Sequence, residues 1–128
     1  MKTLKLFSFI ALFLCSCAPA THCTSTELGV SFTDETARML FKEFNGQYVF
    51  RLKLKKGESD IKYYASLQKG TIKVSYMYLN KENPLFTIKG GQTLENRGGY
   101  VEAGNVEIII KSESNANGGE FTFSLNNK

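Results

Sequence analysis

Apolar and polar side chains alternate along most of the chain, from about residue 48 to residue 125. Tyr48, Phe50 and Leu52, for example, alternate with Arg51 and Lys53. A period of two residues is typical of a β-strand that has one face in the core and the other in water. The pattern predicts strands at 48–55, 61–67, 72–78, 106–110 and 121–125, with shorter strands at 85–88 and 100–103. It places Ile61, Tyr63, Tyr76 and Phe121 on the rows that face the core.

Glycine and asparagine separate the apolar runs, and both accept the positive φ angles that tight turns need. The connections are too short for the crossover helices that parallel strands require. We therefore predict an all-β fold, an antiparallel β-sandwich of jelly-roll-like form. The predicted turns are Asn45-Gly46, Lys56-Gly57, Lys69-Gly70, Gly90-Gly91, Gly98-Gly99, Gly104-Asn105 and Asn117-Gly118-Gly119.

The segment 33–44 permits two interpretations. Its apolar residues are spaced as on one face of a helix, and Thr33 is a suitable N-cap for that helix. However, the Asn45-Gly46 pair that follows is typical of a hairpin and favours a strand leading into Tyr48. We predict a strand.

The first residues have the three-part pattern of a secretory signal. A short positive start is followed by the apolar block 6–14, and small residues come after it. This block is about half of the roughly 20 residues that a membrane-spanning helix needs. We therefore predict that 1–16 is a signal peptide rather than a permanent membrane span.

Two processing routes remain open. Leu14-Cys15-Ser16-Cys17 resembles the lipobox of bacterial lipoproteins, which implies cleavage before Cys17 and a diacylglycerol on its sulfur. Two acyl chains hold a protein at a membrane stably, whereas one does so only marginally. Alternatively, Ala18-Pro19-Ala20 fits ordinary signal peptidase and cleavage before Thr21. With lipidation, 17–27 is the lipidation site and a flexible tether, and 28–128 is the β-sandwich domain.

Composition excludes several classes of protein. The formal net charge is +4, and removing Lys2 and Lys5 with the signal leaves +2, which is too little for nucleic-acid binding. The three cysteines lie within the first 23 residues, so the domain is not a disulfide scaffold. Cys23 remains as an odd thiol in the expected tether.

Two segments resemble the bacterial pre-peptidase C-terminal domains. Residues 48–57 (YVFRLKLKKG) have the aromatic-x-aromatic-x-aliphatic strand that ends at a glycine turn, and 119–125 (GEFTFSL) resembles the closing strand. The resemblance implies a jelly-roll-like sandwich with a role in secretion or substrate attachment. Gln47 stands where those domains usually carry acidic residues.

Candidate chemistry is sparse. The close carboxylate pairs, Asp34/Glu35 and Glu58/Asp60, lie in predicted turns or element ends, whereas glycosidase chemistry needs two carboxyls in a cleft. A hydrolase is therefore the least favoured hypothesis. The single histidine, His22, precedes the domain, so we expect no metal ligands, no cofactor and no catalytic residues.

Surface recognition remains as the class of function. We expect a non-enzymatic envelope protein, anchored to the membrane on the extracytoplasmic side, with a binding or structural role toward an envelope polymer or protein. The alternative is a secreted soluble effector or inhibitor released before Thr21. The candidate surface contacts are the outward tyrosine Tyr64 and the basic side chains Arg51, Lys53, Lys55 and Lys62.

Overall fold

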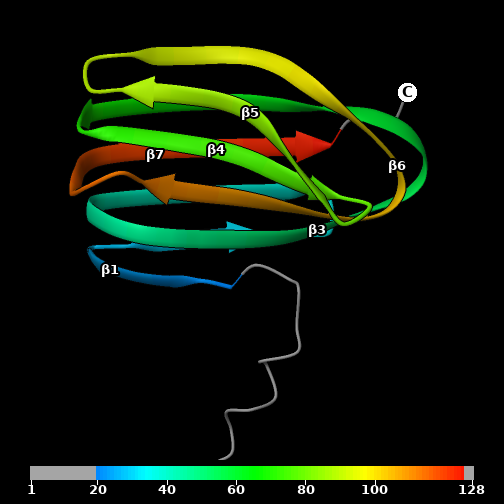
Figure 1. Cartoon of the computed structure of the whole chain (residues 1–128), viewed down its shortest axis with the longest axis horizontal. Helices are drawn as coiled ribbons and strands as arrows, with labels where there is room; N and C mark the ends of the chain where they lie inside the picture. Colours follow the sequence, from blue (N-terminus) through cyan, green and yellow to red (C-terminus); the bar gives the residue numbers. More distant parts are fainter. Residues whose placement is uncertain (1–19, 126–128) are drawn as a thin grey trace, which may run out of the picture.

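The computed structural model describes residues 20–125, and within them all regular structure is β-strand. This confirms the predicted all-β class (Figure 1). The seven strands are β1 (His22–Thr26), β2 (Gly29–Phe32), β3 (Thr36–Lys69), β4 (Thr71–Tyr78), β5 (Lys81–Lys89), β6 (Thr93–Ser112) and β7 (Ala116–Leu125).

Two long strands, β3 and β6, bend and are shared by both layers of one curled antiparallel sheet. In the first layer, β7 lies between 36–44 and 61–69 of β3, with β2 and 93–98 of β6 at the edges. In the second layer, β1, 47–54 of β3, 104–111 of β6, β4 and β5 follow one another. Figure 1 shows β3 and β6 crossing between the layers at the right-hand end of the molecule. The predicted jelly-roll-like sandwich is therefore confirmed.

Three glycines mark bends of the long strands rather than ends of strands. Gly46, Gly57 and Gly104 have φ angles of 125°, 80° and 136°. The long strands β3 and β6 change layer at or near these residues. The hairpin predicted at Asn45-Gly46 is wrong, because β3 runs on through it and its two arms pair with other strands. A side chain at Gly46 would lie 2.6 Å from Cys23 Cα, so the close approach of β1 requires glycine.

One two-residue hairpin turn contains no glycine, so the glycine pattern did not predict it. Leu79 and Asn80 connect β4 to β5, with φ angles of 54° and 60°, and Tyr78 pairs with Lys81 across them. Two positive φ angles in succession are the type I′ geometry that matches strand twist. Leucine rarely adopts this conformation, so the sequence pattern missed the turn.

The segment 33–44 is a strand from Thr36 onward, which confirms the preferred interpretation. Thr33 does not cap a helix. Its hydroxyl oxygen accepts hydrogen bonds from the Glu35 and Thr36 amides at 3.3 and 3.1 Å and shapes the turn between β2 and β3.

The expected flexible tether 17–27 is largely structured where the structure describes it. Residues 22–26 form β1, which pairs with 43–47 of β3 at the edge of the second layer. Cys23 packs against the core from this strand, and burial raises the pKa of its thiol. Cys17 and the signal segment lie outside the described residues.

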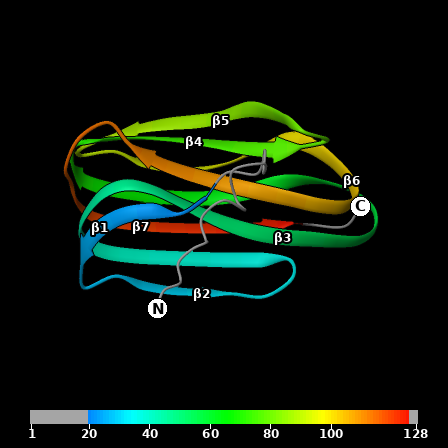
Figure 2. The same ribbon diagram turned by 60° about the horizontal axis from the view of Figure 1, so that its bottom comes forward.

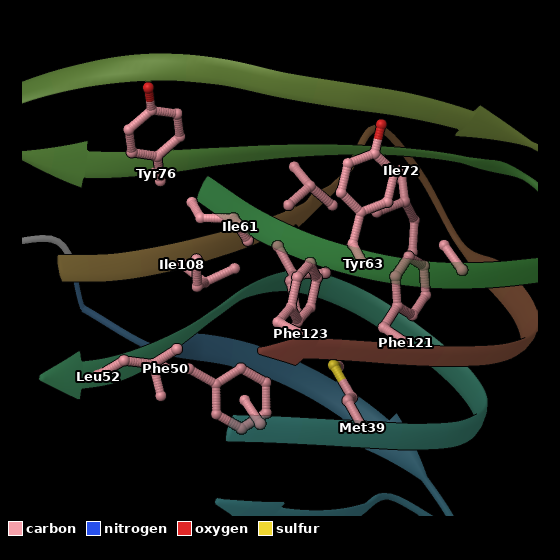
Figure 3. Packing of buried hydrophobic residues seen from close by; sticks show 14 of the residues in the cluster. Met39, Phe50, Leu52, Ile61, Tyr63, Ile72, Tyr76, Ile108, Phe121 and Phe123 are labelled. Carbon is pink, nitrogen blue, oxygen red and sulfur yellow. The ribbon is translucent and has the colours of Figure 1, made fainter. Parts of the chain in front are cut away.

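The core lies between the layers, as the alternation predicted (Figure 3). Phe121 and Phe123 of β7 are fully buried. Tyr63 is the cross-strand partner of Phe123 in the first layer, and Ile108 points into the core from the second layer. Phe86 of β5 closes this stack, because its ring centroid lies 4.3 Å from that of Tyr63.

Two residues depart from the simple alternation. Val49 and Ile109 belong to the opposite, outer face of the second layer, yet they are only 6% and 3% exposed. They are cross-strand partners on β3 and β6. The outer face of the second layer therefore has an apolar row of its own.

Candidate binding groove

The surface residues that the sequence singled out lie on two different faces. Arg51 and Lys53 are exposed on the outer face of the second layer, whereas Lys62 is exposed on the first layer beside the half-buried Tyr64. Because β3 changes layer between these two segments, they never pair with each other. The arrangement does not form one basic stripe.

Two of these basic side chains form ion pairs with neighbouring carboxylates. The Arg51 Nε atom lies 3.0 Å from Glu107 Oε2, and the Lys55 Nζ atom lies 3.7 Å from Asp34 Oδ2. Exposed pairs of this kind contribute at most about 1 kcal/mol to stability. These side chains are therefore already engaged within the surface of the domain.

The tyrosines differ in burial, from core residues to the exposed ring of Tyr100. Tyr63 and Tyr76 are buried, as the alternation predicted. The hydroxyls of Tyr76 and Tyr78 accept hydrogen bonds from the Tyr100 and Glu102 amides, at 3.4 and 2.9 Å, where β6 changes layer. They thus satisfy backbone groups at a bend of the strand.

Tyr100 lies on the surface of this bend between two carboxylates. Its hydroxyl donates to Glu102 at 2.9 Å, with Glu58 Oε2 at 3.3 Å. The hydrogen bond to Glu102 and the nearby negative charges raise the pKa of Tyr100 to about 12. Glu58 is thus brought beside Glu102, a partner that sequence spacing did not indicate. Both carboxylates are exposed.

A groove of about 420 Å³ crosses the outer face of the second layer, over β6, β4 and β5. Cross-strand pairing aligns three rows of side chains across it. We name them the basic row, Lys111, Lys73 and Thr87; the floor row, Ile109, Ser75 and Pro84; and the carboxylate row, Glu107, Met77 and Glu82, of which Glu82 lines the groove.

The floor row is low because β5 contains a bulge. Val74 pairs with Phe86 but Ser75 pairs with Pro84, which leaves Leu85 as the extra residue. Proline lacks a backbone N–H and suits such an irregular position on an edge strand. The bulge lets both Leu85 and Phe86 pack against the core, while the short side chains of Ser75 and Pro84 form the floor.

The two sides of the groove differ in charge. The Lys73 Nζ atom lies 2.9 Å from Glu113 Oε2, whereas Lys111 forms no ion pair with a carboxylate of residues 20–125. On the other side, the Ser75 hydroxyl donates to Glu82 Oε2 at 2.7 Å. A ligand on the floor row thus has cations along one side and a hydrogen-bond acceptor along the other.

The part of the chain that the structure describes holds no cluster of three or more histidine, cysteine or acidic side chains suited to a metal ion. Nor does any helix in this part have the length and hydropathy to cross a membrane. Asp34 and Glu35, one of the predicted carboxylate pairs, line a small hollow with Lys55.

The sequence analysis did not identify the groove. Its basic row joins Lys73 to Lys111, and its floor row joins Ser75 to Pro84 and Ile109. These residues become neighbours only through the register of three strands. Pro84 beside the apolar run 85–88 was the one local signal of the irregular edge.

No protein-family model matches the chain, and no curated protein matches it. Similar folds occur among solved structures. The carbohydrate-binding module TmCBM61, in complex with β-1,4-galactotriose, is 20% identical over 79% of this chain and 70% of that chain, with a TM-score of 0.46. A CBM4 structure is 12% identical over 79% of each chain, with a TM-score of 0.42.

A cupin superfamily protein from Desulfitobacterium hafniense DCB-2 is also 12% identical, over 84% of this chain and 81% of that chain, with a TM-score of 0.33. None of these three is a pre-peptidase C-terminal domain, so the resemblance to that family stays a prediction. The likenesses concern the β-sheet architecture and assign no family.

Proposed function

We propose that this protein is a non-enzymatic binding protein of the bacterial envelope, anchored through a lipid on Cys17, and that the groove over β4, β5 and β6 is its binding site. One observation carries the binding role. Three strands hold a low, partly apolar floor between a basic and an acidic side, in a volume typical of ligand sites.

The anchor is proposed from the apolar block 6–14 and from the lipobox-like residues before Cys17. The Gln47 side-chain amide donates to the Ala20 carbonyl at 2.9 Å, and the Val49 amide donates to the Thr21 hydroxyl at 2.9 Å. Three residues from Cys17 to Ala20 span at most about 11 Å when extended. A lipid on Cys17 would therefore hold the domain close to the membrane surface.

The mature N-terminus tests the anchor. We expect the wild-type chain in the membrane fraction, with an intact mass that shows cleavage before Cys17 and added acyl chains. The Cys17→Ala variant should leave that fraction. A wild-type mass beginning at Thr21 would support the secreted alternative instead. A wild-type chain in the membrane fraction whose mass shows no acyl chains would refute lipid anchoring.

The binding role is tested with envelope polymer from the native host. Mature protein and the Ser75→Trp variant, which fills the floor of the groove, are sedimented with the insoluble polymer. We expect wild type to co-sediment and Ser75→Trp to remain in the supernatant.

Ser66→Trp is a matched control, because Ser66 lies on the outer face of the first layer, opposite Glu120 and Thr93. This variant should co-sediment like wild type. Equal sedimentation of both tryptophan variants and wild type would exclude the groove as the binding site.

A further inference from the structure

We propose that the groove binds a saccharide that bears a carboxylate, with the sugar ring on the floor row and the carboxylate toward Lys111. This inference rests on the proposed function in one respect, namely that the groove is the binding site. It adds the chemical class of the ligand.

The position of the groove argues against an extended peptide. Peptides that bind sheets usually add to a free edge, where main-chain groups are unpaired. The groove instead crosses a sheet face, and its central strand β4 is paired with β5 on one side and β6 on the other. Recognition therefore depends on side chains, and those available are hydroxyl, carboxylate, ammonium and small apolar groups.

The floor row suits one face of a pyranose ring. Pro84 presents exposed aliphatic carbon, and Ile109, which is 3% exposed, lies at the base of the groove. Sugar rings bury their C–H faces against such apolar groups. Ser75 and Thr87 offer hydroxyls at the floor and rim, and Glu82 offers a carboxylate that accepts hydrogen bonds from sugar hydroxyls. Phe86 also lines the groove, and its ring is stacked on Tyr63 of the core.

The positive charge of the basic row favours an acidic sugar over a neutral one. Lys73 and Lys111 lie directly opposite each other on β4 and β6, an arrangement that like charges make unfavourable. Glu113 compensates Lys73, but no carboxylate of residues 20–125 compensates Lys111. The basic row runs two residues from the floor row, a separation of about 7 Å along a strand. A carboxylate at the edge of a ring on the floor reaches this row, while hydroxyls at the opposite edge reach Glu82.

Two oligosaccharides that differ only at C6 test the inference. Cellotriose carries hydroxymethyl groups there, and β-1,4-linked triglucuronate carries carboxylates. We expect titration calorimetry of the mature protein at low salt to show at least tenfold tighter binding of triglucuronate. Binding should weaken as salt is raised, because ions screen exposed charges.

Two matched variants test whether the Lys111 ammonium is the charge that attracts the ligand. Lys111→Met removes the ammonium and keeps the aliphatic stem, and it should weaken triglucuronate binding at least tenfold. Lys62→Met makes the same change on the opposite layer and should leave binding unchanged. Equal weakening by both variants would show non-specific attraction and overturn the inference.

The remaining outcomes separate this inference from the proposed function. Equal affinity for the two trisaccharides, lost in Ser75→Trp, would overturn the acidic class and retain the groove. Failure of triglucuronate to bind, while host polymer still sediments in a Ser75-dependent manner, would likewise overturn the saccharide inference alone. If triglucuronate does not bind and sedimentation with host polymer does not depend on Ser75, the groove is not the binding site.

Discussion

Gly119 packs against a core aromatic ring, and replacing it with alanine tests how the two arms of β3 are held by β7. Gly119 pairs with Phe41 on one arm and Leu67 on the other. An added Cβ would meet Phe41 Cζ and would lie 2.6 and 2.8 Å from the ring's Cε2 and Cε1 atoms. The φ angle of Gly119 is not positive, so the effect is steric rather than conformational.

The Phe41 ring has little room to move. It is 5% exposed, and its centroid lies 5.2 Å from that of Phe44 and 6.1 Å from that of Phe121. Overpacking of a core costs about 1–3 kcal/mol, and this site belongs near the upper end. Replacing a strand glycine with alanine returns roughly 0.5–1 kcal/mol. We therefore expect Gly119→Ala to lower the free energy of unfolding by about 2 kcal/mol.

A double-mutant cycle isolates the contact. Phe41→Leu removes the ring atoms that the new Cβ would meet and should itself cost roughly 1–2 kcal/mol. In that background Gly119→Ala should cost almost nothing, giving a coupling free energy of about 2 kcal/mol. Urea unfolding followed by far-ultraviolet circular dichroism measures each value; the chain has no tryptophan to report by fluorescence.

Gly29→Ala is the matched control. Gly29 lies on the edge strand β2, and an added Cβ there meets no atom within 4 Å. Its effect should stay within about 0.5 kcal/mol, as for most surface substitutions. If Gly119→Ala costs the same with Phe41 and with Leu at position 41, the proposed packing of the ring on Gly119 is wrong.

Three further predictions concern single side chains. Phe86→Ala should lower the free energy of unfolding by roughly 3 kcal/mol, because its ring stacks on Tyr63; an unchanged urea midpoint would contradict this. Tyr100 should titrate near pH 12 in a spectrophotometric titration compared with Tyr100→Phe, and Glu102→Gln should lower that pKa toward 10. Because folding raises this pKa, the contribution of Tyr100 to stability should be present below about pH 10 and lost toward pH 12; a constant pKa in Glu102→Gln would refute the assignment. The Cys23 thiol should react slowly with a disulfide reagent in the folded protein and rapidly in urea, because burial disfavours its thiolate; equal rates would place it in solvent.

The domain was predicted to begin at residue 28, but its first strand begins at His22. The open edge of the sheet explains this difference. The segment 22–26 is polar and lacks strict alternation, which is typical of a tether. It forms β1 because β3 offers unpaired backbone groups at the edge of the second layer, and Gly46 lets β1 approach closely. In Figure 2, β1 and β2 lie along this side of the molecule. Tertiary pairing here overrides a weak local pattern.

The local pattern of the sequence was enough to predict most strands of the domain and most of the side chains that face the core. Ile61, Tyr63 and Phe121 were all predicted from alternation, because a period of two follows from the geometry of a single extended chain. It also determined where the backbone needs glycine: each of the seven predicted glycine turns contains a glycine with positive φ. These properties depend on neighbours in the chain alone.

Which strands pair depends on the fold of the whole domain. A positive φ at Gly46 permits a hairpin or a bend, and the choice depends on partners that are distant in sequence, since 36–44 pairs with β7 and 47–54 with β6. The groove depends on the same choice, because Lys73 meets Lys111 only through the register of β4 and β6. Alternation marks two faces of a strand but carries no information on its neighbours, so the site could not be predicted from local pattern.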